Sequence, residues 1–262
     1  MGIPQHRSLD HDVKALRTTA PAEPSADLHW WYWALLPLVV VLLVIGGYYL
    51  APDFYALMTR RDEQGFGVVE NLTVLVLLPA IVAGFTCFRD RRLFPDWRLG
   101  WTTLTCALAC IYFAGEEMSW GQHIFGWQTP DDFAAANKQR ETNLHNLHGV
   151  GGWFNQKPKM LVEWWLLLGG IMLPAVRQLR RTRPGSDTLM GWFWPTHIVV
   201  PTALLYLAMR SAYWYQDRSG VDIPWWTYDP ETREYLIAQY LSLYLLSIRL
   251  RLTAKSSIGT TA

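Results

Sequence analysis

The sequence is poor in charged residues and in cysteine, and it carries almost no net charge. Charged residues make up 17% of the 262 residues, whereas soluble proteins typically have roughly 25%. A net charge of +1 offers no basic surface for nucleic acid, so we expect no nucleic-acid partner. The cysteines are odd in number and lie in apolar stretches, which argues against a disulfide framework or a redox site. They are Cys87, Cys106 and Cys110.

Several catalytic and transport signatures are also missing. The sequence has no phosphate-binding glycine loop, no nucleophile elbow and no cysteine-pair metal site. It shows no convincing internal repeat, and this weakens the prediction of a classical transporter, since many transporters are built from repeats.

Long stretches without Asp, Glu, Lys or Arg occupy most of the chain instead. A helix that crosses a bilayer needs about 20 mostly apolar residues, and four of six such stretches are long enough. The fourth and sixth have only 13 and 14 uncharged residues, which cover ~20 Å at about 1.5 Å per residue. We predict an all-α, polytopic integral membrane protein with about six transmembrane helices. They are placed at about 30–51, 68–88, 99–119, 160–179, 189–210 and 233–250.

These helices are predicted to form one transmembrane domain, 30–252, between two polar tails. Residues 1–29 are rich in Pro, Ala and charge, which is typical of disorder, and 253–262 form the second tail. The long polar tail before the first apolar stretch argues against a cleaved signal peptide. With the N-terminus inside, 14 of the 23 Lys and Arg residues fall in inner segments. The positive-inside rule therefore places both termini in the cytoplasm.

The stretch "GEEMSWGQHIFGW" ends the third predicted helix with adjacent carboxylates, Glu116 and Glu117. Neighbouring side chains on a helix point about 100° apart, so the two acids do not share a proton directly and at least one points away from lipid. Ionisable groups at this depth usually face a bundle interior or a wet cavity. We predict an outward-facing polar pocket with these acids at its floor, and we take Glu116, Glu117 and Gln122 as candidate catalytic residues.

A 40-residue outer loop, 120–159, follows, and loops of this length are usually functional or disordered. Its segment "TPDDFAAANKQRETNLHNLHG" begins with a helix-start signal, because Thr129 can act as N-cap, Pro130 suits the first helical position and acids follow. We predict an interfacial or re-entrant helix over about 130–148, with a break near Glu141 left open, that folds over the pocket as a lid.

On that predicted helix, Glu141, His145 and His148 are spaced i, i+4 and i+7, which places a carboxylate and two imidazoles on one face. Three interpretations stay open. The three residues could bind zinc or iron, since both metals accept such ligands. Glu141 and His145 could instead be catalytic without a metal, by acid–base chemistry. The same groups could also serve only to hydrogen-bond the loop in place.

The two motifs together resemble a signature of uncharacterised bacterial multi-pass membrane proteins, which reads approximately EEISWGQRIFG followed by ETNLHN. The resemblance covers the 34 residues from Gly115 to His148, and it implies no activity. His123 stands where the family form has Arg, which argues against His123 as an essential metal ligand. The matching positions are Glu116, Glu117, Ser119, Trp120, Gln122, Glu141, Thr142, Asn143, His145 and Asn146.

Two classes of function follow from these observations, with a third, structural interpretation of the motif. The first is an enzyme of the bacterial inner membrane that acts at the outer leaflet on a lipid or a lipid-linked substrate, by acid–base or metal-dependent chemistry. The second is a non-enzymatic carrier of a small solute or proton, or an accessory subunit of a membrane complex. In the third, Glu141 and His145 only fasten the outer loop to the third helix.

Overall fold

The computed structural model describes residues 28–59, 67–149, 151–180, 188–227 and 229–259. Helices make up most of this part of the chain, and no strand occurs in it apart from one isolated bridge between Asn137 and Leu147. The predicted all-α class is therefore confirmed. The predicted disordered tail lies outside the described residues except for its last two positions, 28 and 29.

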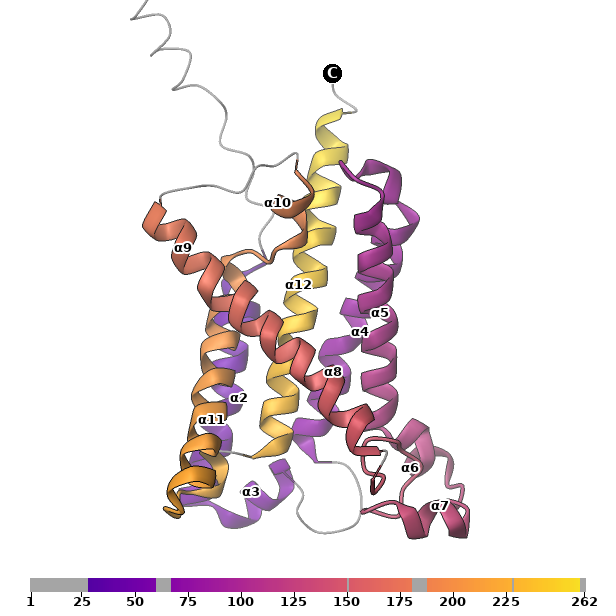
Figure 1. Cartoon of the computed structure of the whole chain (residues 1–262), viewed down its shortest axis with the longest axis vertical. Helices are drawn as coiled ribbons and strands as arrows, with labels where there is room; N and C mark the ends of the chain where they lie inside the picture. The colour runs from indigo at the N-terminus through magenta and orange to yellow at the C-terminus, as the bar shows by residue number, and fades with distance from the viewer. Residues whose placement is uncertain (1–27, 60–66, 150, 181–187, 228, 260–262) are drawn as a thin grey trace, which may run out of the picture.

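Helix α12, Pro230–Gly259, forms the centre of the bundle (Figure 1). Residues 235–245 are all buried, and α12 packs most extensively against α4, Val68–Arg89. A helix that is buried on every side needs neither an amphipathic pattern nor a long lipid-facing surface. This explains why its uncharged stretch is shorter than a bilayer: the surrounding helices, and not lipid, cover it.

Charges at both ends of α12 are bound by neighbouring helices. Near its start, Glu234 accepts a hydrogen bond from Lys159 at 3.1 Å. Near its other end, Arg249 donates to Asp90 at 2.6 Å. Hydrogen bonds from Arg89 and from Arg249 lower the pKa of Asp90, so this carboxylate stays charged in both partnerships. The helix is held in register by an ion pair at each end.

Six long helical segments run along the bundle, alternately in opposite directions in Figure 1, and the outer ones surround α12. The segment 151–180 crosses the others obliquely (Figure 1). Pro195 interrupts the segment 189–219 between α10, Leu189–Phe193, and the short η5, His197–Val199. The remaining long elements are η1 Trp31–Leu35 with α2 Leu36–Leu50, α5 Arg98–Glu117, α8 Gly151–Trp165, η4 Leu166–Met172, α9 Leu173–Arg180 and α11 Val200–Ser219.

Four helices within the described residues are long and apolar enough to cross a membrane, which supports a membrane protein. They are Trp31–Leu50, Val68–Arg89, Lys157–Arg180 and Leu189–Ser219. The other two predicted spans correspond to α5 and α12, which do not reach this apolar length. Helix α12 also extends beyond the predicted 233–250 and includes most of the predicted second tail.

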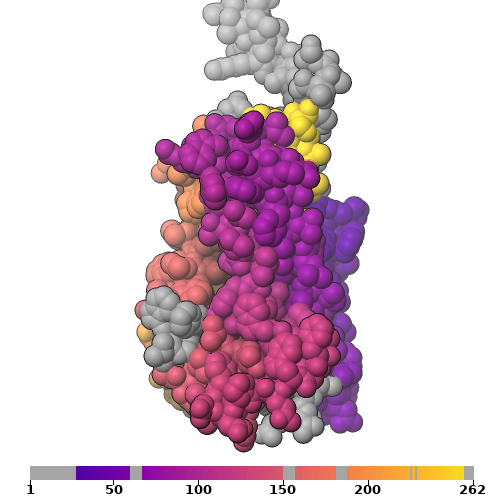
Figure 2. All heavy atoms as spheres, turned by 90° about the vertical axis from the view of Figure 1, so that its right-hand side faces the viewer, coloured from indigo at the N-terminus to yellow at the C-terminus, as the bar shows by residue number. Residues whose placement is uncertain are grey.

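The two ends of the bundle differ in structure. One end, here called the loop end, carries α3, Pro52–Thr59, together with the segment 118–149. That segment contains η3 Ser119–Gly121, α6 Gln122–Phe125 and α7 Asp131–Ala136, and Figure 2 shows it as a lobe at the end of α5. The opposite end, here called the C-terminal end, carries α10 and the last turns of α12 (Figure 1).

Close packing between α4 and α5 depends on Gly84. A Cβ atom at this position would lie 2.6 Å from the Cβ of Ala107 and 2.8 Å from the carbonyl oxygen of Thr103. Small residues allow helix backbones to approach in this way, which is typical of helix contacts in membranes. Gly46 on α2 provides a contrast, because a Cβ there would meet nothing within 4 Å among the described atoms.

We expect Gly84→Ala to lower the free energy of unfolding by about 1–3 kcal/mol, because overpacking forces the two helices apart. The matched substitution Gly46→Ala should be neutral or raise stability by up to about 1 kcal/mol, since alanine favours the helix over glycine. Thermal unfolding of both variants in detergent measures the difference. Equal effects of the two substitutions would contradict the tight α4–α5 contact.

Candidate functional site

A sharp turn at the end of α5 begins the site. Ser119, Trp120 and Gly121 have φ values of 43°, 55° and 89°, and non-glycine residues rarely occupy this left-handed region. The turn folds the ring of Trp120 back over Gly115, where an added Cβ would lie 2.8 Å from the ring. The Trp120 indole N–H then donates to Glu116 Oε1 at 2.7 Å. The strained backbone is thus stabilised by packing and by a partly buried hydrogen bond.

Glu116 fastens the loop to α5. Its Oε2 atom accepts hydrogen bonds from the backbone N–H groups of Leu144 at 2.7 Å and His145 at 2.8 Å. The ring Nδ1 of His145 lies 3.2 Å from the same oxygen. Charge-assisted hydrogen bonds of this kind are stronger than neutral ones. With Trp120 on its other oxygen, the carboxylate of Glu116, which is only 3% exposed, is fully engaged in structure.

Glu141 makes a second connection between the loop and the turn. Its carboxylate accepts from Ser119 Oγ at 2.5 Å and from Asn143 Nδ2 at 3.0 Å, and His123 Nε2 lies 2.9 Å from its other oxygen.

Gln122 adds a third connection, because its Oε1 accepts from the backbone N–H of Thr142 at 2.7 Å. Of the predicted catalytic residues, Glu141 and Gln122 therefore both form hydrogen bonds that connect the loop to the turn after α5.

The predicted helix over about 130–148 is wrong in its length, because α7 ends at Ala136, well before the break near Glu141 that the prediction allowed. Where the helix would continue, the Oδ1 atom of Asn137 accepts hydrogen bonds from the backbone N–H groups of Gln139 at 2.9 Å and Glu141 at 3.3 Å. Asparagine side chains compete with helical hydrogen bonds in this way, and Arg140 adopts a φ of 61°.

The helix start is also displaced by one residue from the prediction. Pro130, and not Thr129, is the N-cap of α7. The hydroxyl of Thr129 contacts that of Thr142 at 2.9 Å instead.

The loss of this helix separates Glu141, His145 and His148, the predicted zinc or iron ligands. Glu141 contacts the turn after α5, His145 contacts Glu116, and the backbone N–H of His148 donates to the carbonyl of Ala136 at 2.9 Å. Their ligand atoms do not gather within 4.8 Å of one another. The i, i+4, i+7 spacing had assumed a helix that is absent here.

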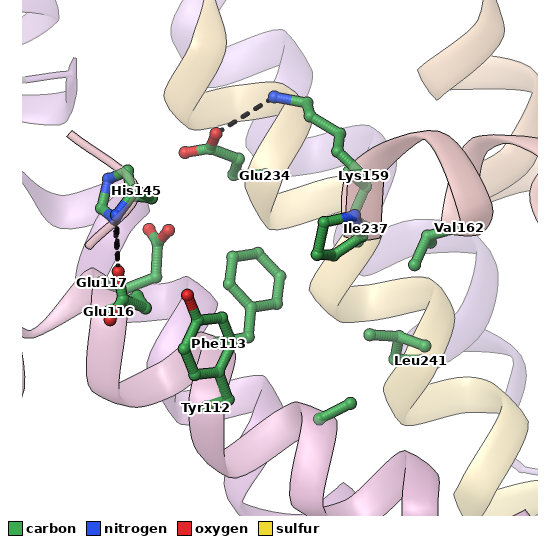
Figure 3. Close-up of a pocket in the computed structure, with 12 residues that line it drawn as sticks. Tyr112, Phe113, Glu116, Glu117, His145, Lys159, Val162, Glu234, Ile237 and Leu241 are labelled. Carbon is green, nitrogen blue, oxygen red and sulfur yellow. Dashed lines mark hydrogen bonds and ion pairs between the residues drawn. The ribbon is translucent and has the colours of Figure 1, made fainter. Parts of the chain in front are cut away.

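A pocket of about 140 Å³ opens between α5, α8 and α12 near the loop end (Figure 3). Its deeper wall is apolar and is formed by Phe113, Val162, Ile237 and Leu241. Its end near the loop is ionisable and is formed by Glu116, Glu117, His145, Lys159 and Glu234. Exposed residues, Ala109 and Pro158, also line it, so the pocket opens to the side of the bundle. The predicted polar pocket is thus amphipathic.

Glu117 has a different environment from Glu116. Its side chain is buried, at 5% exposure, and Figure 3 shows it directed toward Glu234 and the pocket. It accepts no hydrogen bond and forms no ion pair with any residue in the described part of the chain, which is unusual for a buried polar group. The two adjacent carboxylates therefore have separate roles, one in the loop and one in the pocket.

Sequence reasoning missed three residues around Glu117. Glu231 and Glu234, in the first turns of α12, bring ligand oxygens within 4.8 Å of one another and of Glu117. Lys159 of α8 contacts Glu234 across the pocket, at 3.1 Å (Figure 3). The signal available in the sequence was the charged stretch "PETRE" directly before an uncharged helix.

The chain matches no protein-family model, no curated protein and no solved structure. The resemblance of residues 115–148 to uncharacterised multi-pass membrane proteins therefore stays a prediction.

The isosteric pair Glu116→Gln and Glu117→Gln separates the two roles. We expect Glu116→Gln to lower the free energy of unfolding by about 2–3 kcal/mol and to expose the loop to protease, because it replaces a charged acceptor of several hydrogen bonds. Glu117→Gln should leave stability unchanged or raise it, since it removes a buried charge that has no partner. Thermal unfolding and limited proteolysis measure both effects. Greater destabilisation by Glu117→Gln would contradict this assignment.

Proposed function

We propose that the protein is a membrane enzyme that binds a lipid or a lipid-linked molecule in the α5–α8–α12 pocket and acts on its polar end by acid–base chemistry. The apolar chain of this molecule would lie along Phe113, Val162 and Leu241, and its polar end would reach Glu117 and His145. The observation that carries the proposal is the pocket itself, which is apolar along its length, ionisable at one end and open at the side of the bundle.

The side opening matters because a molecule dissolved in a bilayer reaches a helix bundle laterally. Leu108 and Ala109 on α5 are both exposed at this level, as are Met160 and Leu161 on α8. Ligand sites are usually apolar clefts with a few convergent polar groups, and this pocket has that composition. A small polar solute would find no hydrogen-bonding partner along most of the pocket wall.

Two groups at the ionisable end suit acid–base catalysis. Glu117 is a carboxylate that the loop does not use, and a buried carboxylate of this kind can exchange a proton with a bound molecule. His145 is oriented through its Nδ1 by Glu116, which is how a carboxylate fixes an imidazole in many active sites. Glu116 is then a positioning residue, and Glu117 and His145 are the candidate catalytic residues.

The alternatives retain less support. A carrier of protons or small solutes needs a polar path along the bundle, but the deeper wall of the pocket is formed by apolar side chains such as Ile237 and Leu241. An accessory subunit would use the ionisable groups for docking, whereas Glu116 and Glu117 are buried.

The proposal includes six membrane spans, with α5 and α12 as the third and sixth. Both are flanked or covered by the four apolar helices. Basic residues lie at the C-terminal end, on the connection from α4 to α5 and on the last turns of α12. They include Arg89, Arg91, Arg92, Arg98, Arg249 and Arg251. Under the positive-inside rule, this distribution supports a cytoplasmic orientation of that end. In our proposal the membrane is a bacterial inner membrane, and the pocket opens toward its outer leaflet.

Ala109→Trp tests the lipid site by filling the pocket mouth. The probe is a phospholipid with a photoreactive acyl chain, reconstituted with the purified protein. We expect crosslinks to map to α5, α8 and α12 in the wild type, and to fall several-fold in Ala109→Trp. The matched control is Leu108→Trp, which introduces the same indole side chain at an exposed neighbour outside the pocket and should crosslink as the wild type does. Crosslinks spread evenly over the bundle surface, and equal in both variants, would contradict the proposal.

A further inference from the structure

We infer that Glu117, Glu231 and Glu234 bind one divalent cation at the ionisable end of the pocket. Each residue offers a carboxylate oxygen, and these oxygens lie within 4.8 Å of one another. Carboxylates from two helices are typical ligands of hard ions such as Mg²⁺, Mn²⁺ and Ca²⁺. This site differs from the predicted zinc or iron site in the outer loop and shares no residue with it.

The environment of Glu117 gives independent support. Its side chain is buried and points into the pocket (Figure 3). No described residue donates a hydrogen bond to it or forms an ion pair with it. Two nearby acids have a different environment. Glu116, at the end of α5, and Glu141, in the loop, each accept several hydrogen bonds. An isolated buried carboxylate is costly unless a proton or a cation compensates it. Glu117 is therefore placed to receive a ligand, and not to hold the fold.

Charge balance favours a divalent ion over a monovalent one. The three carboxylates carry up to three negative charges, and the described cation in contact with them is Lys159, 3.1 Å from Glu234. Glu231, like Glu117, has no hydrogen-bond or ion-pair partner among the described residues. Three carboxylates and one ammonium leave two negative charges, and a single divalent ion would neutralise them. Repulsion between the acids is relieved in the same step.

The pocket supplies room for the rest of the coordination shell. Mg²⁺ and Ca²⁺ bind six or more oxygens and usually keep some water or a substrate oxygen. The adjoining pocket, of about 140 Å³, holds several water molecules at about 30 Å³ each. An ion at this position would also face the polar end of any molecule bound in the pocket, where it could orient a phosphate or a hydroxyl group. The cation site itself does not depend on lipid binding.

The charge of Lys159 provides a further test of the cation site. Its ammonium already occupies one oxygen of Glu234, so it competes with the ion and repels it. Removal of this charge should strengthen cation binding. If Lys159 only maintains the packing of α8, its substitution should instead weaken cation binding, because the pocket would lose its shape.

The test is titration of Mn²⁺ into the purified protein in detergent, with unbound Mn²⁺ followed by its electron paramagnetic resonance signal. We expect one saturable site in the wild type that Mg²⁺ or Ca²⁺ displaces. Glu117→Gln should weaken binding at least tenfold, and Lys159→Gln should strengthen it several-fold. Two matched controls, Asp222→Asn and Lys157→Gln, remove exposed charges from the same end of the molecule and should bind as the wild type does.

Three results would overturn the inference: no saturable binding by folded wild type, unchanged affinity in Glu117→Gln, or weaker binding in Lys159→Gln. If Glu117→Gln does not fold, Glu231→Gln is measured in its place with the same expected loss. Lipid crosslinking to the pocket without cation binding would overturn this inference alone. Cation binding without lipid crosslinking would overturn only the proposed function.

Discussion

The hydrogen bonds from the backbone of Leu144 and His145 to the carboxylate of Glu116 are the contact on which the site depends. They join a loop segment to the last turn of α5 across 28 and 29 residues of chain. The same carboxylate also accepts from the Trp120 indole of the strained turn and contacts the ring of His145, so the two features share one acceptor. A buried, charged acceptor is suited to this role, because breaking its bonds would leave an uncompensated charge.

The adjacent acid, Glu117, follows from the same geometry. Consecutive side chains of a helix point in different directions, so the turn that uses Glu116 for the loop leaves Glu117 facing α12. There it meets acids from the start of a helix whose own centre is fully buried. The bundle thus places ionisable groups at one end of an apolar pocket, and rigid helices hold most of them.

Much of the fold could be predicted from apolar length, since the predicted helix at 68–88 became Val68–Arg89. Helix α12 was harder to predict, because it is surrounded by other helices and the length required of a lipid-facing apolar stretch did not apply to it. The predicted loop helix does not continue past Asn137, because the side chain of this residue accepts hydrogen bonds from backbone N–H groups that a helix would use. The acids around Glu117 come from distant parts of the sequence, and no local spacing links them to one another.

The most direct test of the different roles of Glu116 and Glu117 is an experimental structure of the protein in lipid nanodiscs by electron cryomicroscopy. We expect Glu116 bonded to the 144–145 backbone, and elongated density in the α5–α8–α12 pocket that ends beside Glu117. A pocket closed by direct packing of α8 on α5, or a Glu117 carboxylate bonded to the loop in place of Glu116, would contradict this assignment.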